Sequence, residues 1–389
     1  MNTVKQPHDR LRVMSVFGTR PEATKMAPLV LSLRQNPKIE SIVTVTAQHR
    51  DLLDPVLSLF GIHPDYDLNI MRQSQTLTSI SVRALEGLEK VFADSQPDLV
   101  LVHGDTSSAF IGALSAYYAR IPVGHVEAGL RTYDKYSPFP EEMNRRLIAP
   151  LADLHFCPTA ASEANLLREN ASGTIYVTGN TAIDTVHMLA RTPYTFRLPF
   201  LNDPALRQKR LLFLTAHRRE NYGKPLENIM HAIQELIDRF PDLIVVYPMH
   251  PSPTVRQTAT SILGQTERVY LCDPLLVDDS INLIQKSDLV LTDSGGLQEE
   301  APSLGKPVLV LRSETERPEA VTAGTVSLIG TEKEQIVSAV SQLLTDSALY
   351  ATMSHAVNPY GDGHASERIV AAILHHFYGE PAPERFRPI

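Results

Sequence analysis

LVLTDSGGLQEEAPSLGKPVLVLRSETERPE, which spans residues 289–319, is the stretch of sequence that decides the fold. An apolar run from Leu289 stops at a Thr-Asp-Ser-Gly-Gly turn, and a helical pattern follows as far as Gly305. A second apolar run then begins at Pro307. This order predicts a strand, a glycine turn, a helix and a second strand, which is the repeating unit of a parallel α/β sheet.

The glycine turn is a candidate binding site for an anion. A helix N-terminus presents unpaired N–H groups, and glycine lets an anion come close to them, so Ser294, Gly295 and Gly296 form a candidate phosphate cradle. Glu300, about one turn further along, is suited to accept hydrogen bonds from ribose hydroxyls, and Arg317 is suited to hold a diphosphate. The alternative is an ordinary turn beside a solvated acidic face, because glycine turns recur throughout α/β proteins.

Composition restricts the class of protein. The 389 residues are enough for two domains, and the formal net charge of −8 argues against nucleic acid as the main partner. Cys157 and Cys272 form neither a disulfide framework nor a metal-ligand spacing, so we expect no metal site. Every apolar stretch falls short of the about 20 residues that span a bilayer, so we expect a cytoplasmic protein without a membrane partner.

Apolar runs and helical patterns alternate along most of the chain, which predicts an α/β fold throughout. Residues 1–10 look like a disordered extension, and a first domain follows over residues 11–190. Three prolines and no clear periodicity mark residues 191–210 as a linker, and a second domain covers residues 211–365. We expect the tail PAPERFRPI to be loose.

Charged residues in the first half follow apolar runs. Arg20 and Lys25 come after the run that ends at residue 17, near the strand end where open α/β sheets bind ligands. Asp105, Glu127 and Glu141 also come near strand or helix ends. Carboxylates that converge in a cleft are suited to general acid and base catalysis. The alternative is two solvated cations on a first helix and, for Glu141, an ordinary helix start.

Two histidines in the second half follow apparent strands. His217 comes after the run at residues 211–215, and His250 comes after the run at residues 243–247. Most single histidines have a structural role, but two beside a phosphate cradle could donate to a diphosphate and stabilise its departure.

Ten motifs give the chain a resemblance to a known family. They are, in order, FGTRPEATK, TAQHR, LVHGDT, GHVEAGLR, PEEMNR, TGN, HRREN, YPMHP, LTDSGGLQEEAPSLGKPVLVLR and ERPEA. In this order they resemble the non-hydrolysing UDP-N-acetylglucosamine 2-epimerases, over nearly all of residues 12–370. The resemblance implies two Rossmann-like domains that face each other across a cleft, as in the glycosyltransferase B architecture. It also implies a homodimer, and a final helix at residues 366–378 that completes the first domain.

The family's reaction is the reversible epimerisation of UDP-N-acetylglucosamine at C2, without a cofactor, and its product supplies bacterial surface polysaccharides. UDP leaves C1 while C2 loses its proton, and UDP then adds back to the bound 2-acetamidoglucal. By position in the motifs, the resemblance assigns catalytic roles to Asp105, Glu127, Glu141, His217 and Lys25. By the same matching it assigns contacts with the UDP-sugar to Arg20, Lys25, His250, Ser294, Gly295, Gly296, Glu300 and Arg317.

Some relatives bind a second UDP-N-acetylglucosamine as an activator. Four residues of this chain match that site, namely Gln48, His49, Glu141 and Arg218. Ser74 stands where some members have an arginine, and Ser280 stands where many have an aromatic residue near the uridine.

Three other activities share many of these features. A hydrolysing epimerase would release free N-acetylmannosamine, and a related epimerase would act on a 2,3-diacetamido uronic acid nucleotide sugar. A glycosyltransferase of the same fold would use the same nucleotide half but would not need the three carboxylates. A sensor of nucleotide sugars without catalysis would leave Asp105, Glu127 and His217 without a role.

Overall fold

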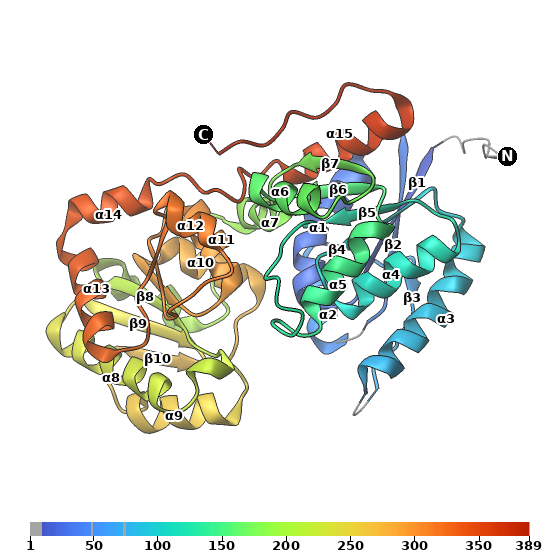
Figure 1. Cartoon of the computed structure of the whole chain (residues 1–389). Coiled ribbons are helices and arrows are strands. Elements are labelled where there is room, and N and C mark those ends of the chain that lie inside the picture. Colours follow the sequence, from blue (N-terminus) through green and yellow to red (C-terminus); the bar gives the residue numbers. More distant parts are fainter. Residues whose placement is uncertain (1–9, 48–49, 73–74, 389) are drawn as a thin grey trace. The chain divides into compact units, whose positions relative to one another are not determined.

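The computed structural model describes residues 10–47, 50–72 and 75–388, and Figure 1 shows the chain. It divides into two units, one of Met1–Thr185 with Tyr360–Arg387 and one of Val186–Pro359 with the last two residues. Each unit has one parallel sheet with helices between its strands. The prediction of two Rossmann-like α/β domains is confirmed, whereas the cleft between them stays a prediction.

The sheet of the first unit has seven parallel strands in the order β3-β2-β1-β4-β5-β6-β7. The order reverses at β1, which lies between β2 and β4, and open α/β sheets bind ligands at such a switch point. The strands are β1 (Leu11–Phe17), β2 (Ile39–Val45), β3 (Tyr66–Asp67), β4 (Leu99–His103), β5 (Val123–Val126), β6 (Leu154–Cys157) and β7 (Thr174–Val177).

Helices lie between the strands of this sheet, and some of them begin at a threonine that caps the helix. The side chains of Thr76, Thr106 and Thr159 each accept a hydrogen bond from a backbone N–H of the helix that follows. The helix α15 packs against α1, although more than three hundred residues separate them in the chain. The helices are α1 (Arg20–Gln35), α2 (Arg50–Leu59), α3 (Leu77–Ser95), α4 (Ser107–Tyr118), α5 (Glu141–Ile148), α6 (Ala160–Arg168), α7 (Thr181–Leu189) and α15 (Ala365–Tyr378). The boundary between the units falls within α7, after Thr185.

The second unit repeats the plan with six parallel strands in the order β10-β9-β8-β11-β12-β13. Its strands are β8 (Arg210–Thr215), β9 (Leu243–Pro248), β10 (Val269–Cys272), β11 (Leu289–Thr292), β12 (Val308–Val310) and β13 (Val326–Leu328). Its helices are α8 (Lys224–Arg239), α9 (Pro253–Leu263), α10 (Val277–Lys286), α11 (Gly295–Glu300), α12 (Pro318–Ala323), α13 (Lys333–Thr345) and α14 (Ser347–Ser354). The strand, turn, helix and strand predicted from residues 289–319 are β11, the glycine turn, α11 and β12.

Residues 191–210, the predicted linker, belong to the second unit and contain two short 3-10 helices, Pro199–Asn202 and Pro204–Gln208. Arg197 lies 2.8 Å from Asp278 and 3.0 Å from Asp279, both in α10. The segment is therefore held to its own unit by charged contacts.

The prediction of a loose C-terminal tail is wrong. Phe386 is only 4 % exposed, and its backbone N–H donates to the carbonyl of Val177 over 2.9 Å. Arg385 binds both carboxylate oxygens of Glu163. Prolines and charges dominate the tail, so its composition concealed the one aromatic side chain that anchors it.

In the part of the chain that the structure describes, every helix is too short or too polar to cross a membrane. Among the same residues, no three metal-ligating side chains gather in one place.

Gly18 lies in the turn after β1, where there is no room for a side chain. A Cβ atom at this position would lie 1.9 Å from Oγ1 of Thr46 and 2.6 Å from Oγ of Ser108. We expect Gly18→Ala to lower the free energy of unfolding by about 1–3 kcal/mol, because both hydroxyls are buried in a packed core. Urea unfolding measures the loss, and a second substitution, Thr46→Ala, should recover part of it. If the double variant instead lost as much unfolding free energy as the two single variants together, the proposed clash between residue 18 and Thr46 would be contradicted.

Candidate active site

Glu127 is the centre of the polar site in the first unit. It follows β5, is 8 % exposed and has a left-handed backbone with φ of 61°. The Lys25 ammonium forms an ion pair with its carboxylate, and the Asn180 side-chain amide donates to the same oxygen over 3.0 Å. The structure therefore brings together two residues that the sequence singled out, Lys25 and Glu127, and adds Asn180, from the TGN motif.

Asp105 follows β4 and has a cationic partner of its own. Its carboxylate lies 2.5 Å from the guanidinium of Arg145, which is buried in α5. The side chain of Asn144 donates to the backbone carbonyl of Asp105 over 2.8 Å. Sequence reasoning found Asp105 but missed Arg145. Asn144 and Arg145, the last two residues of the PEEMNR motif, both lie on the short helix α5.

The two glutamates at the start of α5 have different surroundings. Glu142 is completely buried and accepts hydrogen bonds from the backbone N–H groups of Thr132 and Tyr133, over 3.0 and 3.1 Å. Glu141 is partly exposed at the first position of the helix. Glu142 thus holds the loop before α5, whereas Glu141, the predicted site residue, keeps part of its surface exposed.

A buried carboxylate orders the turn that carries Arg20. The Glu22 side chain accepts hydrogen bonds from the backbone N–H groups of Gly18 and Thr19, over 3.0 and 2.8 Å. Its other oxygen accepts from the hydroxyl of Thr106 over 2.6 Å, next to Asp105. Sequence reasoning missed Glu22, although its position three residues after a helix-capping threonine is the signal of a capping box.

Three buried histidines lie on adjacent strands below these residues. Burial lowers the pKa of His103, on β4, to about 4 and the pKa of His125, on β5, to about 3, so both are neutral at pH 7. Burial also lowers the pKa of His155, on β6. Nε2 of His125 lies 2.7 Å from the carbonyl of Gly104, the residue before Asp105, and this hydrogen bond fixes the turn. Nε2 of His103 lies 3.9 Å from the Glu127 carboxylate.

The polar site of the second unit is built on Asp293, which follows β11. One carboxylate oxygen accepts from the backbone N–H groups of His217 and Arg218, over 2.7 and 2.8 Å, and from the side chain of Asn221 over 3.0 Å. The other oxygen lies 3.2 Å from Nδ1 of His217. At this distance the negative charge of Asp293 favours a proton on Nδ1 of His217, which would leave Nε2 for a ligand. Sequence reasoning missed the role of Asp293.

His217 and His250, which the sequence predicted to act together, stack on each other. Their ring centroids are 5.5 Å apart and the rings are 9° from parallel. Burial lowers the pKa of His217, the charge of Asp293 opposes this, and the His250 and Arg218 charges add to the lowering. His217 is therefore neutral at pH 7 in the unliganded chain, and a nearby anion would favour its protonation.

The glycine turn gathers two cations. A Cβ atom at Gly295 would lie 3.7 Å from the guanidinium of Arg218 and 3.9 Å from that of Arg317. A Cβ atom at Gly296 would lie 3.2 Å from the carboxylate of Glu300. Arg317 forms an ion pair with Glu299, which orients its guanidinium. The residues of the predicted phosphate cradle and their cations thus lie together in this unit.

Other predicted positions are placed as follows. Arg20 is the first residue of α1, in the turn that Glu22 orders. Ser280 lies in the first part of α10. Three positions of the predicted activator site lie outside the described residues, namely Gln48, His49 and Ser74.

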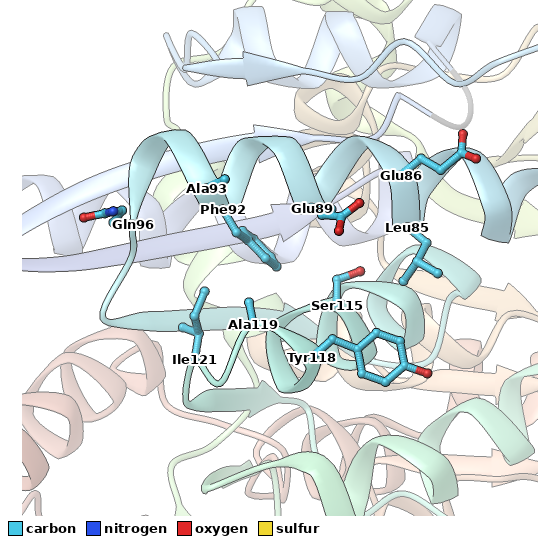
Figure 2. Close-up of a pocket in the computed structure, with 10 residues that line it drawn as sticks. All are labelled: Leu85, Glu86, Glu89, Phe92, Ala93, Gln96, Ser115, Tyr118, Ala119 and Ile121. Carbon is cyan, nitrogen blue, oxygen red and sulfur yellow. The ribbon is translucent and has the colours of Figure 1, made fainter. Parts of the chain in front are cut away.

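A separate pocket of about 480 Å³ lies between α3 and α4 of the first unit (Figure 2). It is lined by Leu85, Glu86, Glu89, Phe92, Ala93, Gln96, Ser115, Tyr118, Ala119 and Ile121. None of these described lining residues belongs to the predicted site. The lining includes the carboxylates of Glu86 and Glu89 but no lysine or arginine side chain. We assign this pocket no catalytic role.

Each unit has a parallel sheet, and polar residues follow the strands of both sheets. They are carboxylates in both units, and histidines and a glycine turn in the second. This arrangement is typical of Rossmann-like enzymes that bind nucleotides. The model of a family described as UDP-N-acetylglucosamine 2-epimerase matches residues 31–374. The chain belongs to the UDP-N-acetylglucosamine 2-epimerase family.

Individual relatives agree with this assignment. The UDP-N-acetylglucosamine 2-epimerase of Bacillus subtilis is 55% identical over 379 residues, which cover 97% of this chain and 99% of the relative. A structure of S. aureus MnaA with UDP has a TM-score of 0.87 and 51% identity, and covers 97% of this chain and 100% of its own. A structure of UDP-GlcNAc 2-epimerase from Neisseria meningitidis bound to UDP-GlcNAc has a TM-score of 0.83 and 46% identity, and covers 94% and 100%.

The buried histidines predict a loss of stability in acid. Between pH 3 and 6.5 the unfolded chain binds a proton at residue 125 that the folded chain does not, so stability falls as the pH falls below 6.5. We expect His125 to account for about 1 kcal/mol of lost unfolding free energy per pH unit in that range. His125→Gln keeps a nitrogen donor for Gly104 but does not titrate, so the fall should be shallower in this variant.

The measurement is the midpoint of urea unfolding at pH 7.5, 6.0 and 5.0. His63→Gln, at an exposed position, is the matched control and should retain the pH dependence of the original chain. If the unfolding free energy of His125→Gln depended on pH as strongly as that of the original chain, burial of His125 would not be the cause of the loss of stability in acid.

Proposed function

We propose that this chain is an isomerase that converts UDP-N-acetylglucosamine reversibly into UDP-N-acetylmannosamine, without hydrolysis. The observation that carries the proposal is the buried Glu127 carboxylate, paired with Lys25 at a strand end, in a chain that belongs to this family. The relatives' bound ligands, UDP-GlcNAc in one and UDP in another, support the choice of substrate.

The reaction begins when C2 loses its proton to a carboxylate while the bond from C1 to the diphosphate breaks. A double bond forms between C1 and C2, which gives 2-acetamidoglucal and UDP. UDP then adds back to C1 as C2 takes a proton on the opposite face. Such a path needs two acid–base groups that exchange roles between the two directions, and Asp105, Glu127 and Glu141 are the candidates.

The departing diphosphate needs stabilisation as negative charge develops on it. We assign this task to His217, which Asp293 orients and whose protonated form Asp293 stabilises. The remaining contacts with UDP fall to the glycine turn of Ser294, Gly295 and Gly296 and to Arg20, Lys25, His250, Glu300 and Arg317. Arg218 is a further cation at the glycine turn.

We also propose a cytoplasmic homodimer whose product serves surface polysaccharide synthesis in bacteria. A second UDP-N-acetylglucosamine as activator, at Gln48, His49, Glu141 and Arg218, is part of the same proposal.

Proton NMR of UDP-N-acetylglucosamine incubated with the protein in D2O tests the reaction. We expect UDP-N-acetylmannosamine to appear, to reach equilibrium with the substrate, and both sugars to carry deuterium at C2, because solvent supplies the proton that returns. Free UDP with N-acetylmannosamine would instead identify a hydrolysing enzyme. A complete absence of exchange at C2, with fresh substrate and added activator, would favour a transferase or a different sugar.

The role of Asp293 predicts a kinetic effect. In Asp293→Asn the amide oxygen replaces the carboxylate oxygen that accepts three hydrogen bonds, so the amide nitrogen faces Nδ1 of His217. The imidazolium of His217 then loses its counter-charge, so the departing diphosphate faces at most a neutral N–H donor, and we expect kcat to fall by about 10²–10³-fold, as the loss of a charge-stabilising donor does. The alkaline limb of the kcat profile should also move to lower pH, because the carboxylate no longer stabilises the imidazolium.

Asp273→Asn is the matched control, since Asp273 is an exposed residue of the same unit that contacts Arg256 at the surface. It should leave kcat and its pH profile unchanged. Normal kcat in Asp293→Asn would exclude the proposed orienting role.

A further inference from the structure

The chain beyond α15 folds back onto the first unit. In Figure 1 it leaves α15 and doubles back as an extended segment to the C-terminus. Glu380 lies 2.7 Å from the ammonium of Lys38, and Arg385 donates from its two terminal nitrogens to the carboxylate of Glu163, over 2.7 and 2.6 Å. The fork between Arg385 and Glu163 is bidentate, which fixes both the direction and the register of the tail.

Phe386 completes a hydrophobic cluster below the Glu127 turn. Its ring is buried in a cluster whose other members are Ala128, Ala149, Cys157, Leu166 and Val177. Ala128 is the residue directly after Glu127, and its N–H donates to the carbonyl of Phe156 over 3.0 Å. The left-handed backbone of Glu127 is therefore followed at once by a residue of the cluster that Phe386 fills.

The same ring also lies near the segment that carries Asn180. A Cβ atom at Gly179 would lie 3.6 Å from Cγ of Phe386, and Phe386 donates to the carbonyl of Val177. Arg368 lies over the Phe386 ring, 5.4 Å from its centroid, and donates to the carbonyl of Thr178 over 3.2 Å. Phe386 thus contacts the segment that carries Asn180 and shares one hydrophobic cluster with the residue after Glu127, and Asn180 donates to the Glu127 carboxylate.

We propose that Arg385 and Phe386 are positioning residues for Glu127, and that the tail acts as a strap that holds the carboxylate and Asn180 in register. A residue in a left-handed conformation persists only where its surroundings determine it, and the tail supplies part of these surroundings. Loss of Phe386 would leave a cavity beside Val177, in the cluster that also contains Ala128, into which the Asn180 segment and the Glu127 turn could relax. The inference rests on the proposed function, since it assigns Glu127 a task in epimerisation.

Misplacement of a catalytic group by about 1 Å can lower a rate by about 100-fold. We therefore expect Phe386→Ala to lower kcat by about 10- to 100-fold, while the KM for UDP-N-acetylglucosamine and the Kd for UDP change less than about 2-fold, because the predicted UDP contacts lie mainly in the other unit. Phe386→Leu, which refills most of the cavity, should recover most of kcat. Arg385→Ala should lower kcat less than Phe386→Ala.

Arg387→Ala is the matched control for Arg385→Ala, because Arg387 is an exposed arginine two residues further along the same tail. It should retain the original kcat. A chain that ends at Ala382 provides a second test, in which a synthetic peptide of residues 380–389 should restore kcat when added in excess. The same peptide with Phe386→Ala should fail to do so.

A tail that only stabilises the fold would give a different result. The melting temperature of Phe386→Ala and of the shortened chain would fall, but kcat at 20 °C, where both remain folded by circular dichroism, would equal that of the full chain. This result would overturn the positioning role and leave the proposed function intact. If the full chain makes no UDP-N-acetylmannosamine in the NMR experiment, the proposed function fails, and the strap inference fails with it.

Discussion

The first unit depends on the pairing of one buried carboxylate, Glu127, with one largely buried ammonium, Lys25. Each charge has lost most of its water, and removal of either would leave the other in the interior without its ion-pair partner. The pairing joins the end of β5 to α1, and Asn180 adds the chain after β7. Three segments that are distant in the sequence thus meet at a single carboxylate, and the geometry of the site follows from that meeting.

The two units share one local arrangement of a buried carboxylate and a turn. In each, the turn after the central strand at the switch point, β1 or β8, presents backbone N–H groups to a buried carboxylate. Glu22 serves the turn after β1, and Asp293 serves the turn after β8. A carboxylate that accepts two adjacent backbone N–H groups holds the backbone of the turn in one conformation. Arg20 lies at this turn in one unit and His217 in the other.

The sequence was sufficient for the elements and for residues that directly follow strands, because the carboxyl ends of parallel strands share one edge of a sheet. Asp105, Glu127, His217 and the glycine turn could be found in this way. Most of the residues that orient them could not, because their roles depend on contacts between distant parts of the chain that local patterns do not record. These residues are His125, Arg145, Asn180 and Asp293, whereas Glu22 carried a local signal, its spacing from Thr19. The tail was predicted wrongly for the same reason, since Phe386 finds its partners more than two hundred residues earlier in the chain.

The backbone of Glu127 has a consequence for protein engineering. Its φ of 61° suits glycine or asparagine better than glutamate, so any procedure that ranks residues by local backbone preference would replace it. Such a redesign would improve a local score while it removed the charge around which Lys25 and Asn180 are arranged. Sequence optimisation of this chain for thermal tolerance should therefore keep position 127 fixed, together with the two segments that contact its carboxylate.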